Sequence, residues 1–186
     1  MGTFTSTGSG GNLADGATYG NTSPGSRGTD FPGDDDVLVV ASGDTVTMTA
    51  DATIGSVDIQ GTLTTDGTAR TLTLDDGGQG YICEHRGTVS TTINLTINSN
   101  YAGDRLIRLN NGGNGDFNNV SINLQSTSRK LTIGSEAASI DGNLTITQGE
   151  LNTDSSNNYA LTVDGNVEIE SGGTLTGNAS AISMGS

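Results

Sequence analysis

The sequence of 186 residues contains no tryptophan, two prolines and a single cysteine, Cys83, and only 4% of its residues are aromatic. One cysteine cannot form a disulfide within the chain, so a disulfide-stapled scaffold is excluded. Basic residues are also scarce, because 7 Lys and Arg stand against 21 Asp and Glu, for a formal net charge of −14. Nucleic-acid binding depends on cations that neutralise phosphates, so we expect no nucleic-acid partner.

Long apolar runs are missing as well. No stretch approaches the ~18 apolar residues of a membrane-spanning helix, so we expect no membrane insertion. The start of the chain has neither the basic segment nor the apolar segment of a secretory signal peptide. The composition is nevertheless typical of proteins outside the cell. Three routes are consistent with this combination: release by lysis, as for virion proteins, a dedicated secretion system, or a leader absent from the given sequence.

Gly, Thr, Ser and Asn together make up half of the chain, and because they are poor helix formers, a helical bundle is disfavoured. Residues 1–36 combine these residues with both prolines and with few large apolar side chains. We expect 1–36 to be an extended, turn-rich arm with little core of its own, either a flexible leader or an attachment arm that clasps a neighbouring subunit. This arm, or the strand at Val37–Val40, could also cap the first coil. The candidate attachment residues are Phe4, Leu13, Tyr19 and Phe31.

From Val37 onward, apolar residues alternate with polar ones in short segments, the pattern of β-strands. Gly, Asn, Asp and Ser separate the segments, and no helical period is sustained. The segments recur at a nearly constant interval, beginning at Leu72, Leu95, Val120, Leu144 and Val167. A second series with the same interval starts at Ile82, Ile107 and Leu131, and Leu151 and Leu175 repeat it once more.

A period of about 23–25 residues with several short strands indicates a solenoid whose coils stack on one another. We therefore predict an all-β fold, a right-handed parallel β-helix over residues 37–186 that continues beyond the given C-terminus. An asparagine directly precedes four members of the first series: Asn94, Asn119, Asn143 and Asn166. Stacked about 4.8 Å apart, these side chains would form a hydrogen-bonded ladder along one corner.

Few residues are candidates for chemistry. Asp34, Asp35 and Asp36 form the densest acidic run and are weak candidates for Ca²⁺ ligands, but a solvated turn is the preferred interpretation. Cys83 and His85 share a strand face, where a small core thiol is preferred over a nucleophile. Asp75 and Asp76 could line a groove near arginines, but surface ion pairs are the preferred interpretation. We expect no catalytic residue, no metal and no cofactor.

Residues 31–47 and 52–64 carry a resemblance to a known group of proteins. A Pro-x-x-Asp-Asp-Val segment from Pro32 to Val37 is followed by Gly-x-Thr-Val from Gly43 to Val46 and by a Gly-Ser strand ending in Gly-Thr-Leu. This order resembles the opening of β-helical surface and bacteriophage structural proteins, and is similar to the eight-glycine extracellular domain that precedes some β-helices. The resemblance implies a β-helix start and an extracellular location, but no particular reaction.

The combined expectation is a structural, non-enzymatic bacteriophage virion protein, such as a tail fibre or spike base or a head decoration fibre, that forms a rigid projecting rod. A bacterial cell-surface adhesin or filament subunit is the alternative, and a polysaccharide-degrading β-helix enzyme is the third candidate. The expected partners are further copies of the chain, with a trimer as one form, other virion proteins bound through the arm, and host-surface glycans. The expected location is the virion, with the bacterial surface as the alternative.

Overall fold

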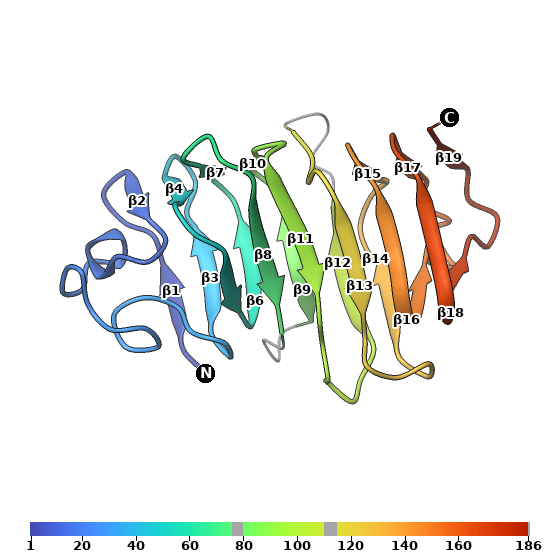
Figure 1. Ribbon diagram of the computed structural model, residues 1–186, viewed down its shortest axis with the longest axis horizontal. Helices are drawn as coiled ribbons and strands as arrows, with labels where there is room; N and C mark the ends of the chain where they lie inside the picture. The colour runs from blue at the N-terminus through green and yellow to red at the C-terminus, as the bar shows by residue number, and fades with distance from the viewer. Residues whose placement is uncertain (76–79, 110–114, 186) are drawn as a thin grey trace.

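The chain winds as a parallel β-helix, in which each coil contributes short strands that pair with the coils before and after it (Figure 1). The computed structural model describes residues 1–75, 80–109 and 115–185. Within these ranges every pairing between strands is parallel, and the single helix is a 3-10 turn, η1 (Gly16–Tyr19). No helix of this part of the chain is long and apolar enough to cross a bilayer. The predicted all-β solenoid is thus confirmed.

Three sides enclose the core. The first face consists of β1 (Thr3–Thr5), β3 (Val37–Val40), β6 (Ser56–Ile59), β9 (Tyr81–His85), β12 (Arg105–Arg108), β14 (Lys130–Ile133) and the end of β16 (Leu144–Asn152). The second face consists of β5 (Ala52–Ile54), β8 (Arg70–Leu74), β11 (Ile93–Ile97), β13 (Val120–Asn123) and the start of β16, and β18 (Val167–Thr176) lies beside all of β16.

The third side is made of two shorter sheets. One contains β2 (Gly10–Asn12), β4 (Thr45–Met48), β7 (Thr62–Thr65) and β10 (Thr88–Val89), and the other contains β15 (Ala138–Ile140), β17 (Leu161–Val163) and β19 (Ile182–Met184). The coil turns from the second face to the first within β16 at Gly149, whose φ of 94° lies in the left-handed region that favours glycine.

Columns of aliphatic side chains fill the interior. The pairing registers place Leu72 beside Leu95, Leu95 beside Val120, Val120 beside Leu144, and Leu144 beside Val167. These are the neighbours that the interval in the sequence predicts, and the pairing of Leu151 with Leu175 is confirmed as well. Burial of each such side chain contributes about 1.5–3 kcal/mol to folding, so the repeating columns are the main source of stability.

The second predicted series has a different register. Ile107 pairs with Cys83 and with Ile133, while Leu131 pairs with Arg105. Leu106 pairs with Tyr81, so Ile82 is an extra residue in β9, a β-bulge that changes the register. Because side chains alternate with a period of two, a register shifted by two positions still points the same set of side chains inward. The sequence pattern therefore cannot distinguish the two registers.

The N-terminal segment is not the extended arm expected from its composition. Strand β1 pairs with β3 and β2 pairs with β4, so residues 1–36 add a partial coil and cover the N-terminal end of the β-helix. We call these residues the cap. Leu13 and Tyr19 are buried in the chain's own core, and Phe4 and Phe31 pack against it. The physical reason is that an open first coil would expose unpaired backbone groups and apolar side chains, which the cap covers.

Candidate functional site

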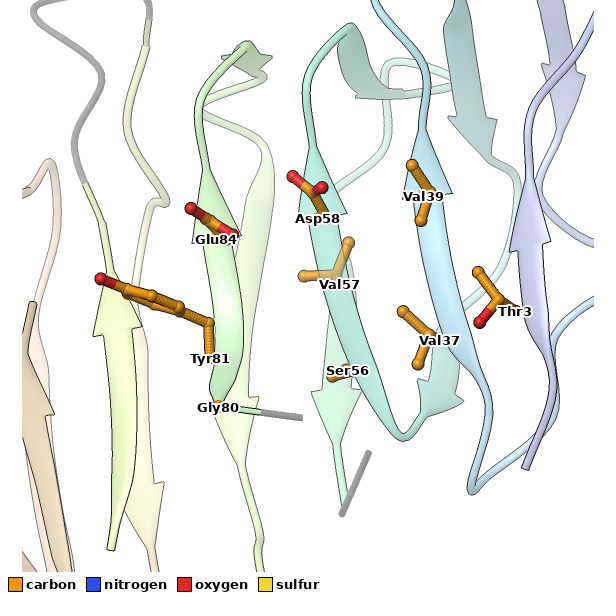
Figure 2. Close-up of a pocket in the computed structure, with 9 residues that line it drawn as sticks. All are labelled: Thr3, Val37, Val39, Ser56, Val57, Asp58, Gly80, Tyr81 and Glu84. Atoms are coloured by element: carbon orange, nitrogen blue, oxygen red, sulfur yellow. The ribbon is translucent and has the colours of Figure 1, made fainter. Parts of the chain in front are cut away.

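A groove of about 340 Å³ lies on the first face, beside the cap (Figure 2). Strand β3 contributes Val37 and Val39, the adjacent β6 contributes Ser56 and Asp58, and β9 contributes Glu84, with further lining from β1 and from the start of β9. The groove is therefore built from successive coils, and its parts come from positions that are distant in the sequence.

Strand alternation decides which side chains reach the groove. In β3, Leu38 and Val40 are fully buried in the core, so Val37 and Val39 lie on the outer side of the strand, where Val37 is still only 8% exposed. The pairing register places Ser56 beside Val37 and Asp58 beside Val39. An apolar strip on β3 therefore lies directly next to a polar strip on β6.

Two carboxylates and one guanidinium form the polar rim. Asp58 pairs in register with Glu84 of the next coil. The Nη2 atom of Arg86 donates to Oδ2 of Asp58 at 2.6 Å and lies 3.4 Å from Oε2 of Glu84. The hydrogen bond to Asp58 raises the pKa of Arg86 above its usual value, so this guanidinium stays charged. Nε2 of Gln60 also donates to Oδ2 of Asp58, at 2.7 Å, so the Asp58 carboxylate is already held by two side chains.

Ser56 holds a hydroxyl that is buried beneath the groove and is not accessible from its surface. The residue is 2% exposed, and its Oγ atom has no hydrogen-bond partner among the described residues. A buried hydroxyl without a partner is costly, and such atoms are rare in folded proteins. Gly80, at the entrance to β9, leaves space nearby, because a β-carbon added there would meet no atom within 4 Å.

Tyr81 lines the groove where β9 begins, but its ring leaves the strand on the side away from β6 (Figure 2). Its ring extends along the first face toward Gly134, where an added β-carbon would lie 3.0 Å from the Tyr81 hydroxyl and 3.4 Å from Leu106. The absence of a side chain at Gly134 thus makes room for the ring. Figure 2 shows Tyr81 and Glu84 on β9, with Asp58 and Val57 on the neighbouring strand.

The structure gives two of the three candidate Ca²⁺ ligands other partners. Asp36 accepts hydrogen bonds from the backbone N–H groups of Gly33 and Gly2, and Asp34 forms an ion pair with Arg27. Asp35 lies in the turn between them. Nowhere in the described ranges do three or more His, Cys, Asp or Glu side chains gather closely enough to hold a metal ion.

Cys83 and His85 both face the core rather than the groove. Both are 0% exposed, and burial raises the pKa of the Cys83 thiol, so the reactive thiolate is suppressed. His85 lies with Nε2 3.1 Å from the Gly87 carbonyl oxygen and Nδ1 3.5 Å from that of Leu109. Burial is the main cause of the lowered pKa of His85. Asp76 lies outside the described residues.

The four asparagines stack along one corner as a hydrogen-bonded series. Nδ2 of Asn119 donates to Oδ1 of Asn94 at 2.8 Å. Oδ1 of Asn119 accepts from the backbone N–H of Asn143 at 2.9 Å and from its Nδ2 at 3.1 Å. The backbone N–H of Asn166 donates to Oδ1 of Asn143 at 2.8 Å. The series links successive coils and has a structural role.

Sequence reasoning did not find the groove. Asp58 and Glu84 pair in register, but their separation is longer than the predicted period, because β9 carries the bulge. Val37 and Val39 were the available signal for the groove in the sequence, because apolar residues on the outer side of a strand interrupt the alternation of apolar and polar residues. Neither a protein-family model, nor a curated protein, nor a solved structure matches this chain.

Proposed function

We propose that this chain is a structural, non-enzymatic component of a bacteriophage virion, at the base of a tail fibre or spike or in a head decoration fibre. The observation that carries the proposal is the parallel stack, in which the coils are joined edge to edge along the long axis of the molecule (Figure 1). Backbone hydrogen bonds between coils run along that axis, so bending or stretching the rod would break many of them together.

The cap favours a rod that survives outside the cell. It covers the first coil with β1 and β2 and with the buried side chains of Leu13 and Tyr19. The hydroxyl of Tyr19 donates to the Leu13 carbonyl oxygen at 3.0 Å, and the Tyr19 ring meets Phe4 edge to face, with the ring centroids 5.8 Å apart. A covered end reduces the strand edge that could pair with other proteins or start unfolding.

The cap also changes the proposed contacts. Leu13 and Tyr19 cannot clasp a neighbouring protein while they are buried in their own core, so attachment to other virion proteins would use the outer surface of the cap. The proposed homo-oligomer, with a trimer as the first form to test, would likewise use outer surfaces of the rod.

Quantitative mass spectrometry of purified particles tests the virion proposal. The expected result is a fixed copy number of the chain per particle, with antibody labelling at the tail or head surface. Recovery of the chain from the bacterial surface and not from particles would instead support the adhesin or filament subunit.

Sedimentation equilibrium tests the oligomer, and a stable monomer at micromolar concentration would count against it. Release of reducing ends from capsular or cell-wall polysaccharide would support the third candidate, an enzyme.

A further inference from the structure

The cap leaves one side of the first full coil, which consists of β3, β4 and β5, without a paired strand. Strand β1 continues the first face and β2 continues the third side, whereas β5 pairs only with β8 among the described residues. We propose that the free edge of β5 binds an extended, basic peptide segment of another protein, which adds to the second face as a further strand. The inference does not depend on the virion proposal, because a partner of any origin could use this edge.

The backbone of Thr53 points toward this free edge. On the opposite edge of β5, the carbonyl oxygen of Ile54 accepts from the N–H of Asp75, which follows β8. Neighbouring residues of a strand direct their backbone groups to opposite edges. In agreement, the carbonyl oxygen of Thr53 accepts from Nη2 of Arg27 in the cap, at 2.6 Å. The N–H and C=O of one residue share an edge, so Thr53 can form both backbone hydrogen bonds with an added strand.

A hollow of about 360 Å³ lies between this edge and the cap. Its lining consists of Asp51, Ala52 and Thr53 on one side and of Leu13, Ala14, Arg27, Phe31 and Pro32 on the other. Ala52 pairs with Leu72 and so continues an inner column with a much smaller side chain. An apolar side chain of an added strand would lie beside Ala52 and contact Leu13 and Phe31, which would extend the column by one position.

The charges around the hollow favour a basic partner. Asp51 is exposed at the edge itself, and Asp34 and Asp35 line an adjoining hollow that shares Arg27 with the first. Arg27 is 48% exposed and forms an ion pair with Asp34. Because exposed ion pairs contribute little, an added strand can displace Arg27 from Thr53 at low cost, and a lysine of the partner can occupy the space beside Asp34. The net charge of −14 also attracts a cationic segment.

Other occupants fit less well. A second copy of the chain would bring a further net charge of −14, and an acidic peptide or a nucleic acid would also meet like charge. A helical partner uses its backbone N–H and C=O groups within the helix, so it cannot continue the ladder at Thr53. An extended basic segment satisfies both the backbone groups and the surrounding carboxylates.

Fluorescence anisotropy with a labelled peptide of alternating Val and Thr, with a Lys at each end, tests the proposal. The peptide is expected to bind and to shift the amide resonance of Thr53 in ¹⁵N-labelled protein. Thr53→Pro removes the outward N–H, and proline is tolerated where a strand's N–H faces away from the sheet. We expect this variant to bind about tenfold more weakly or not at all. Thr53→Val is the matched control, because it keeps the N–H and should bind like the wild type.

Arg27→Ala is expected to strengthen binding of the same peptide about threefold, because it removes both a like charge and the group that competes for the Thr53 carbonyl oxygen. Lys130→Ala controls for the change in charge. Lys130 forms an ion pair with Asp104 and lies on the first face, outside the lining of the hollow. Its removal takes away one positive charge in the same way and should leave the affinity unchanged.

Two further peptides keep the test decisive if circular dichroism shows that Thr53→Pro does not fold. A peptide with Glu in place of each Lys, and one with Pro in place of each Val, should both fail to bind. The proposal is overturned if the basic peptide does not bind, if the proline peptide binds equally well, or if Arg27→Ala weakens binding. Self-association of Arg27→Ala without peptide binding would identify a second copy as the occupant and would overturn it too. None of these outcomes would alter the case for the rod.

Discussion

Substitution of Asn119 by alanine is the sharpest test of how the coils are held in register. Asn119 stands inside the asparagine series and takes part on both sides. Its Nδ2 donates to Asn94, and its Oδ1 accepts from both the backbone N–H and the side chain of Asn143. Asn119→Ala therefore removes three hydrogen bonds and leaves the Asn143 N–H without that acceptor.

The magnitude follows from these bonds. Each contributes about 0.5–1.5 kcal/mol net, and the half-buried position lets water replace part of the loss, so we expect Asn119→Ala to lower the free energy of unfolding by about 2–3 kcal/mol. Asn166→Ala is the control. In the contact with Asn143, Asn166 donates through its backbone N–H, which alanine keeps. Its side chain is exposed, so we expect a loss below about 0.5 kcal/mol.

Urea unfolding followed by far-ultraviolet circular dichroism measures both variants, and the slope of the transition checks that the unfolded state is unchanged. The expected result is a lower midpoint for Asn119→Ala and a midpoint near that of the wild type for Asn166→Ala. Equal losses for the two variants, within about 0.5 kcal/mol, would refute the ladder as a source of stability and would reduce these asparagines to turn residues.

Three further predictions concern close packing and pH. Gly87→Ala should destabilise the fold strongly, because an added β-carbon would lie 1.9 Å from the Gly61 carbonyl oxygen, whereas Gly80→Ala should be nearly neutral in thermal melts. His85 has a lowered folded pKa, so stability should be complete above the unfolded value of about 6.5 and should fall as pH drops below it, until the folded pKa is passed. Urea midpoints across that range should lose this slope in His85→Leu. Asp141 has a raised pKa from partial burial and from neighbouring carboxylates, so its ionisation opposes folding as pH rises. In urea titrations at pH 7, Asp141→Asn should raise the free energy of unfolding by about a few tenths of a kcal/mol after solvent screening.

Part of the candidate site could have been anticipated from the sequence, and part could not. Val37 and Val39 are visible as apolar residues on alternate positions of a strand whose other positions are also apolar. Their placement beside Asp58 and Glu84 depends on which strands become neighbours. The bulge at Ile82 lengthens that coil to a separation outside the period, so no spacing rule would have joined the two carboxylates.

The sequence by itself determined the coil. Alternation placed Leu95, Val120 and Leu144 inward, because side chains of a strand change face with a period of two. Their spacing placed them over one another, because a repeat of nearly constant length brings equivalent residues of successive coils side by side. The tertiary structure alone decided which side chains cover the first coil and where the outer surface is hollow. Leu13 and Tyr19 show no periodicity that would reveal their burial. They become core residues because covering the exposed end of the β-helix lowers the free energy of the fold. A local sequence pattern does not indicate that contact.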